Sequence, residues 1–234
     1  MDVCINLLTF ADDTARPLHR RNQPGYVESQ KKMVKFFREK CPQVKHFHIY
    51  GHEDLINSDL YKKHPEMFSG LHGVKGDSTR PIGIFAYCQG TLIYDTLLKI
   101  KNNDFLLWHD ACPVELEKYI QNKSITAYNL NKQIKYCIEN KGILVRTDPL
   151  TRPPIKKNAS PQLIADLKAE SVADKITSCA SWILIQKTPH TLKIWKKISD
   201  YQSERLLKIR NNNYADTSQE VIDLILKVEG MGKF

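Results

Sequence analysis

Three side chains with metal-binding or proton-transfer chemistry follow a short apolar run. Phe105–Trp108 (Phe-Leu-Leu-Trp) predicts a strand that is buried on both faces, and His109, Asp110 and Cys112 come at its end. In open α/β sheets, ligands bind beside the carboxyl ends of the strands. A carboxylate at this place is therefore well positioned for chemistry, although a structural role for Asp110 as the cap of a turn explains its position equally well.

A second group of candidate ligands surrounds Val44–Tyr50. His46, His48 and His52 are spaced by two and four residues, a spacing that a metal ion could use, and alternation in a strand places His46 and His48 on one face. Imidazoles in such positions are more often surface groups or hydrogen-bonded core groups. The sequence therefore favours a structural interpretation of these histidines over a metal site.

The segments that must position these residues alternate between strands and helices. Besides the run at 105–108, the residue patterns predict strands at Val3–Phe10, Val44–Tyr50, Gly142–Thr147 and Ser178–Gln186. They predict helices at Tyr26–Lys40, Ile82–Lys101, Glu115–Asn122, Asn129–Asn140, Pro161–Ala173, Thr191–Lys208 and Ser218–Val228. Leu55–Pro81 and Thr151–Pro161 are rich in Gly or Pro and predict irregular segments.

The first strand, helix and strand form a βαβ unit, which favours a parallel sheet with a right-handed crossover. We therefore expect an α/β fold with a Rossmann-like sheet flanked by helices, in a single domain over residues 1–234. The chain contains no Gly-x-Gly-x-x-Gly turn, no Gly-x-x-x-x-Gly-Lys-Ser/Thr loop and no Gly-x-Ser-x-Gly elbow. This argues against a dinucleotide-binding turn, a P-loop and a serine-hydrolase elbow.

Several segments, taken in order, carry a family resemblance. They are Thr9-Phe10-Ala11, Ile49-Tyr50, Glu53-Asp54-Leu55, Asp95–Ile100, Asn103-Asp104 and Leu106–Cys112 (Leu-Leu-Trp-His-Asp-Ala-Cys). This ordered set resembles the nucleotide-sugar-binding half of the GT-A glycosyltransferases, above all capsule-type and large-DNA-virus members, whose strand ends in Asp-Ala-Gly or Asp-Ala-Asp. The likeness covers residues 3–113 and, more faintly, Ser178–Gly230.

In the second half, Trp182–Thr188 is similar to the strand beside the acceptor cleft of that family. Asp216–Gln219 resembles a degraded form of its late His-Arg-x-Asp-Gln-Ser segment. The resemblance thus implies a GT-A-like domain in which residues 1–113 bind the nucleotide sugar and residues 114–234 form the acceptor side.

The resemblance also implies roles for individual residues. The donor-binding set would be Thr9, Phe10, Ala11, Asp12, Gln89, His109 and Asp110, with the first four against the nucleoside. Asp110 and Cys112 would occupy the metal-binding positions, and Asp216 and Glu220 are the candidate general bases from the late segment. Both acids can also be explained as N-cap and first-turn residues of the final helix.

The implied reaction moves a sugar from a UDP-, GDP- or dTDP-sugar to a glycan or protein-linked acceptor. Mn²⁺ or Mg²⁺ held by carboxylates would clamp the departing diphosphate. Cys112 departs from the family pattern, because a neutral thiol is a poor ligand for a hard cation. Two alternatives stay open: an inactive sugar- or protein-binding module on the same fold, and a basic nucleic-acid-binding protein.

Composition constrains the partners. The 234 residues carry a formal net charge of +9, but the lysines are spread along the chain, which favours a solvated basic surface over a nucleic-acid face. The six cysteines form no Cys-x-x-Cys pair, which is typical of free thiols in a reducing compartment. We see no signal peptide and no apolar run long enough to span a membrane, and we expect a cytoplasmic protein of a cell or an infected host cell.

Overall fold

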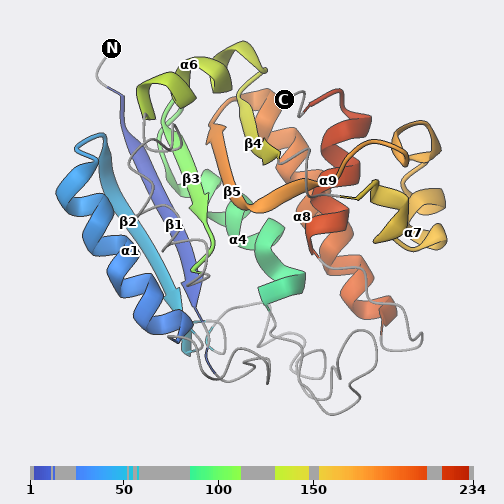
Figure 1. Ribbon diagram of the computed structural model, residues 1–234, viewed down its shortest axis with the longest axis horizontal. Helices are drawn as coiled ribbons and strands as arrows, with labels where there is room; N and C mark the ends of the chain where they lie inside the picture. Colours follow the sequence, from blue (N-terminus) through green and yellow to red (C-terminus); the bar gives the residue numbers. More distant parts are fainter. Residues whose placement is uncertain are drawn as a thin grey trace.

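Figure 1 shows the computed structural model of the chain. The structure describes residues 3–11, 13, 25–51, 53–54, 57, 85–111, 130–147, 153–209 and 218–231. The predicted helix at Glu115–Asn122 lies outside these residues, as does the predicted irregular segment Leu55–Pro81 apart from residue 57.

The described strands form one open, mixed five-stranded sheet in the order β2-β1-β3-β5-β4. Their bounds are β1 Ile5–Ala11, β2 Val44–Gly51, β3 Phe105–His109, β4 Ile143–Thr147 and β5 Ser178–Gln186. β1 pairs in parallel with both β2 and β3, whereas β5 runs antiparallel to β3 and β4. The predicted α/β class, with an open sheet and helices, is confirmed, and all five predicted strands are present.

Helices α1 (Tyr26–Lys40) and α6 (Leu130–Glu139) cover one side of the sheet, which we call the α1 face (Figure 1). Both are amphipathic, and their apolar stripes meet the strand residues that alternate toward them. The shared core consists of Met33, Val34 and Phe37 of α1, Leu130, Ile134 and Cys137 of α6, and Ile5, Leu7, Phe105, Leu107, Trp182 and Leu184 of the strands, together with Cys41, Val44 and Leu144.

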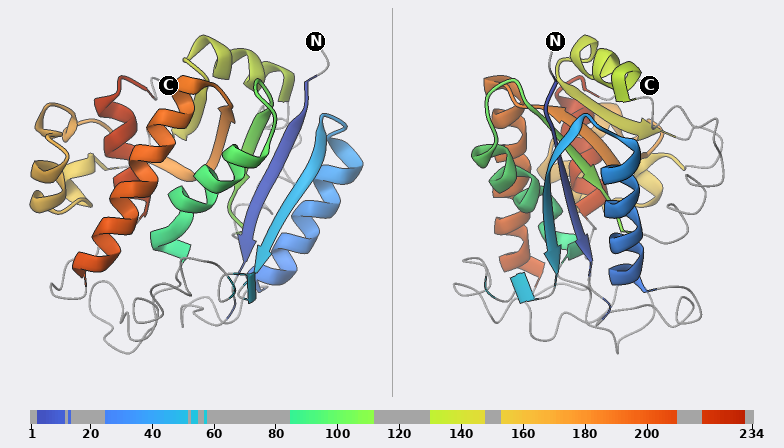
Figure 2. Two further views of the ribbon diagram at one scale, coloured as in Figure 1. Left: turned by 180° about the vertical axis from the view of Figure 1, so that it is seen from behind. Right: turned by 90° about the vertical axis from the view of Figure 1, so that its left-hand side faces the viewer.

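Helices α4 (Phe85–Lys99), α8 (Pro189–Ile209) and α9 (Ser218–Val228) cover the other side, which we call the α4 face. The right-hand view of Figure 2 shows the sheet between the two helical layers. The core on this side includes Leu8, Leu106 and Trp108 of the strands and Ile93, Trp195 and Leu224 of the helices. The predicted helices at 26–40, 82–101, 129–140, 191–208 and 218–228 are all confirmed, within a few residues at each end.

The prediction of a helix over Pro161–Ala173 is wrong in its length. Helix α7 covers only Pro161–Asp166, and a separate 3-10 turn, η5, covers Glu170–Val172. Lys168 adopts a left-handed backbone with φ 51°, and the N–H of Ala169 donates to the carbonyl of Ile164. This is the hydrogen-bond pattern that closes a helix C-terminus, so the helix cannot continue. The preceding segment, expected to be irregular, contains the short 3-10 helix η4 at Ile155–Lys157.

The direction of β5 also differs from the parallel sheet that the first βαβ unit favours. The segment between β4 and β5 contains η4, α7 and η5, and both 3-10 turns contact α9. A parallel strand would need a crossover that returns along the sheet to its opposite end. This segment makes no such return, so β5 starts where β4 stops and runs antiparallel to it.

None of the described helices is long and apolar enough to cross a bilayer.

Candidate functional site

The carboxyl ends of β1, β2 and β3 lie together because these strands are parallel. They end at Ala11, Gly51 and His109, and we call this side of the sheet the carboxyl end. The chain leaves β1 toward β2 on one side and reaches β3 on the other, so β1 and β3 flank a topological switch point. Ligands of open α/β sheets bind in the crevice outside such a point.

The position of β3 in this arrangement is fixed at its start. Asn103 adopts a left-handed backbone, φ 68°, and its N–H donates to the carbonyl of Lys187 at 3.0 Å. The Lys187 ammonium, buried at the end of β5, donates to the carbonyls of Leu98 at 3.2 Å and Ile100 at 2.6 Å. These bonds satisfy the C-terminal carbonyls of α4 and anchor the turn into β3.

At the carboxyl end, β3 delivers His109 and Asp110 to opposite faces of the sheet. His109 is 1% exposed, and its ring meets the Phe37 ring of α1 edge-on at 5.8 Å, which places it on the α1 face. Its Nδ1 lies 2.7 Å from the backbone carbonyl of Asp110. Because a carbonyl only accepts, Nδ1 carries the hydrogen of this bond.

Asp110 continues the strand, since its N–H donates to the carbonyl of Ser181 on β5 at 2.8 Å. Alternation places it on the α4 face with Trp108, and the residue is partly exposed. A partly exposed carboxylate at the end of a buried strand can accept hydrogen bonds from a ligand or share a cation with it. The predicted place at the end of a strand is confirmed, and the role of Asp110 as a ligand stays a prediction.

The predicted donor-binding residues of β1 are likewise divided between the faces. Thr9 and Ala11 alternate with Ile5 and Leu7 and belong to the α1 face, whereas Phe10 packs in the core of the α4 face. The Thr9 hydroxyl is fully buried and has no hydrogen-bond partner among the described residues.

Two further predicted residues lie on helices of the α4 face. Gln89 of α4 is 4% exposed and precedes Ile93 and Leu97 by one and two turns on the buried stripe. Glu220, in the first turn of α9, is 8% exposed. Phe10, Gln89, Asp110 and Glu220 thus belong to one face of the fold, and Thr9, Ala11 and His109 to the other. Asp12, Cys112 and Asp216 lie outside the described residues.

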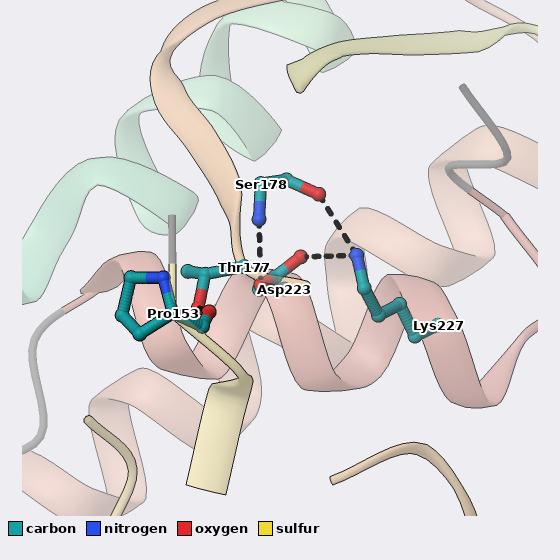
Figure 3. A network of polar contacts seen from close by, with 5 residues as sticks. All are labelled: Pro153, Thr177, Ser178, Asp223 and Lys227. Atoms are coloured by element: carbon teal, nitrogen blue, oxygen red, sulfur yellow. Dashed lines mark hydrogen bonds and ion pairs between the residues drawn. The ribbon is translucent and has the colours of Figure 1, made fainter. Parts of the chain in front are cut away.

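Sequence reasoning missed a buried charged pair beside Glu220. Asp223 and Lys227 form an ion pair at 2.9 Å, with side chains that are 2% and 6% exposed (Figure 3). Asp223 also accepts the N–H of Ser178 at 2.9 Å, and the Lys227 ammonium donates to the Ser178 hydroxyl at 2.9 Å. The signal in the sequence was an Asp and a Lys four residues apart among the otherwise apolar residues 221–228.

This pair anchors α9 to the first residue of β5. Glu220, Asp223 and Lys227 are three and four residues apart, so they share one stripe of the helix, and all three are buried. Thr177, just before β5, is held in turn by the carbonyl of Pro153, which accepts its hydroxyl at 2.7 Å (Figure 3). The network therefore anchors α9 at Asp223 and Lys227 to the start of β5 at the carboxyl end, and Glu220 lies one turn before Asp223 on the same helix.

A second missed residue is Asp13, which caps α1. Its carboxylate accepts the N–H groups of Tyr26 at 2.7 Å and Val27 at 3.3 Å. A β-carbon added at Gly25 would lie 2.7 Å from this carboxylate, so the glycine allows the approach. The positive end of α1 is occupied by a side chain of the protein and is not a vacant anion site of the dinucleotide-binding kind.

Another carboxylate holds the end of β2. Asp54 accepts the N–H of Gly51 at 2.7 Å, and Gln30 of α1 donates to the carbonyl of Tyr50 at 3.1 Å. Carboxylates therefore recur around the carboxyl end, although the described residues contain no group of three or more His, Cys, Asp or Glu side chains that could hold a metal ion.

A hollow among the described residues lies elsewhere. It measures about 490 Å³ and is lined by α8 residues such as His190, Lys193 and Tyr201, with Leu167 and Glu229 at its sides. Since α8 follows the last residue of β5, this hollow extends from the opposite end of the sheet. None of the predicted site residues lines it.

No protein-family model matches the chain, and no curated protein matches it. The function must therefore be argued from the arrangement of its own residues.

Proposed function

We propose that the chain is a GT-A-type glycosyltransferase that uses a nucleotide-diphosphate sugar. The observation that carries this proposal is the placement of Asp110, a partly exposed carboxylate at the end of β3 beside the switch point between β1 and β3. Asp110 would contact the metal ion or the donor ribose, with Gln89 and Phe10 on the same face of the fold.

The arrangement of β5 supports the assignment of an acceptor side. The segment that resembles the family's strand beside the acceptor cleft is the second part of β5, which pairs directly with β3. The first residue of β5 is tied to α9 by Asp223 and Lys227, and Glu220 lies one turn before that pair. Glu220, or Asp216 in the preceding segment, would take the proton of the attacking hydroxyl if the reaction inverts the anomeric centre.

Charge balance explains why a divalent cation would help. The described carboxyl end presents carboxylates such as Asp54 and Asp110, which repel a diphosphate. Mn²⁺ or Mg²⁺ would link the two, and Mg²⁺ is often held by one or two carboxylates plus substrate phosphates. The sequence that connects β1 to α1 adds Arg16, Arg20 and Arg21, which are suited to the same neutralisation.

The second candidate is a sugar- or protein-binding module without catalysis. It is favoured by Cys112, which stands where relatives place a second carboxylate and offers a poor ligand for Mn²⁺ or Mg²⁺. An assay for released nucleoside diphosphate distinguishes the two functions. A transferase releases nucleoside diphosphate, whereas a binding module leaves the nucleotide sugar intact.

Thermal unfolding with UDP-glucose, GDP-mannose and dTDP-glucose, each with and without Mn²⁺, tests the proposal. We expect one nucleotide sugar to stabilise the protein by about 2.7 kcal/mol at 100 times its dissociation constant. Asp110→Asn should abolish the part of this stabilisation that depends on Mn²⁺. Asp104→Asn is the matched control, because Asp104 lies at the other end of the same strand.

The proposal fails if no nucleotide sugar stabilises the chain, or if Asp110→Asn binds as the wild type does. Stabilisation by an oligonucleotide alone, with a steep dependence on salt, would indicate nucleic-acid binding in its place.

A further inference from the structure

The α4 face of β2 carries two histidines beside a buried asparagine. The register pairs Asn6 with His46 and Leu8 with His48, so these side chains share one face of the sheet. β2 is the last strand on its side, and in the left-hand view of Figure 2 no described helix crosses it on this face. His46 is exposed and His48 is partly exposed, so solvent reaches both residues.

Asn6 fixes the hydrogen positions on His48. The Asn6 amide Nδ2 donates to the carbonyl of Phe105 at 3.3 Å, and the side chain is 3% exposed. Since that carbonyl only accepts, the Asn6 Oδ1 is the atom that faces His48 Nε2, at 3.4 Å. Nε2 must therefore carry a hydrogen, and the neutral ring keeps the lone pair of Nδ1 for another ligand.

Neutral imidazole is the form that binds metal ions, because a protonated nitrogen has no lone pair to give. A hydrogen bond from the other ring nitrogen to a protein oxygen, here Asn6 Oδ1, is the usual second contact of a metal-binding histidine.

We propose that His46 and His48 form a two-imidazole site for a borderline transition-metal ion of the Zn²⁺, Ni²⁺ and Cu²⁺ class. His48 binds through Nδ1, His46 adds the second nitrogen from two residues away, and water completes the coordination. Imidazole nitrogen suits these ions, whereas Mg²⁺ and Mn²⁺ favour oxygen ligands. The site is therefore independent of the transferase proposal and its cation.

The spacing of His46 and His48 alone favours a structural role for these residues, whereas the contact of His48 with Asn6 favours a metal site. From the sequence, His46 and His48 are two imidazoles on a strand, and nothing shows which nitrogen of each is available. The hydrogen bonds of Asn6 with Phe105 and His48 supply that information for His48, because they make Nε2 the donor and leave the lone pair on Nδ1.

Imidazole NMR of the ¹⁵N-labelled full chain tests the site without reference to activity. We expect His48 to show the neutral tautomer with hydrogen on Nε2. Substoichiometric Cu²⁺ should broaden the His46 and His48 signals before those of His190, an exposed histidine on α8. A His48 tautomer with hydrogen on Nδ1, or equal broadening of His190, would overturn the proposal.

Calorimetric titration with Ni²⁺ provides the second measurement. His46→Gln and His48→Gln should each weaken binding about tenfold or more, and His190→Gln should leave it unchanged. Glutamine at 48 can still hydrogen-bond to Asn6, so that variant should keep the fold. Asn6→Ala should weaken binding by about 10–100-fold, the range found when second contacts of metal ligands are removed. Wild-type affinity in both histidine variants would contradict the proposed site.

Discussion

At the scale of single residues, the buried pair of Asp223 and Lys227 ties α9 to the start of β5 near the carboxyl end. Each partner compensates the charge of the other, and together they satisfy the N–H and hydroxyl of Ser178. Removing one partner leaves a charge in a low-dielectric interior, which costs far more than the net stabilisation that the pair provides.

We therefore expect Asp223→Ala to lower the free energy of unfolding by about 3–5 kcal/mol, measured by urea denaturation. The double variant Asp223→Leu/Lys227→Met should lose clearly less stability than Asp223→Leu and Lys227→Met lose in sum, because no unpaired charge remains in the double variant. The exposed pair of Lys196 and Asp200 on α8 has the same spacing and serves as control; its disruption should change stability little. Additive losses at 223 and 227 would contradict this account.

The same scale shows which parts of the site can be predicted from sequence. Asp110 follows an apolar run, so its place at a strand end can be read directly. The division of Thr9 and Phe10 between two faces also follows from alternation, but only once the strand is known to have helices on both sides. Asp223 and Lys227 could not be recognised as a buried pair, because a local pattern does not reveal which stripe of α9 meets β5.

At the scale of elements, the contact between α4 and α8 depends on Gly90. A β-carbon there would overlap the Gln202 Oε1 and lie 2.5 Å from the Ile198 Cγ2. The absence of a side chain also lets the Gly90 N–H donate to Gln202 at 2.8 Å. Close helix packing and a hydrogen bond between helices thus coincide at one residue.

Gly90→Ala should lower the melting temperature, measured by calorimetry. Overpacking costs about 1–3 kcal/mol, which exceeds the gain of up to about 1 kcal/mol from the better helix former. The loss should be smaller when Gly90→Ala is made in an Ile198→Ala background, where the clashing methyl group is gone. An unchanged or raised melting temperature in the single variant would show that α8 can move aside without cost.

The bounds and directions of the helices and strands differ in how well the local sequence predicts them. The bounds of α1 and α9 agree with the sequence because each combines an apolar stripe with end signals, such as Glu28 and Lys40 in the first and last turns of α1. α7 was predicted too long, because Lys168 gives no warning that it adopts a left-handed backbone. The residues of β5 predict a strand, but its direction depends on the path of the chain before it.

At the scale of the whole molecule, the core of the α1 face contains two thiols that resist ionisation. Burial raises the pKa of Cys41 to about 11 and that of Cys137 to about 12. In the unfolded chain a thiol loses its proton near pH 8.5. Between these values the folded state holds protons that the unfolded state has released, so the folded state loses stability as pH rises.

The free energy of unfolding should therefore fall between about pH 9 and 11, with a slope of at most about 1.4 kcal/mol per pH unit for each thiol. Denaturation at a series of pH values measures this slope. The Cys41→Ala/Cys137→Ala variant is less stable at neutral pH because it lacks two buried side chains, but its dependence on pH in this window should be flatter. An equal slope in both proteins would rule out the thiols as the cause.

The order of the strands also governs how the chain can be made. β3 pairs on one side with β1, but its other neighbour is β5, which the ribosome delivers only after residue 186. Until then the nascent chain exposes the unpaired backbone of an apolar strand, and β4 has no partner at all. Any fragment that stops before β5 would carry this unprotected border, which is the feature that drives strand-to-strand aggregation. Synthesis of β5 must therefore be followed closely by its insertion between β3 and β4.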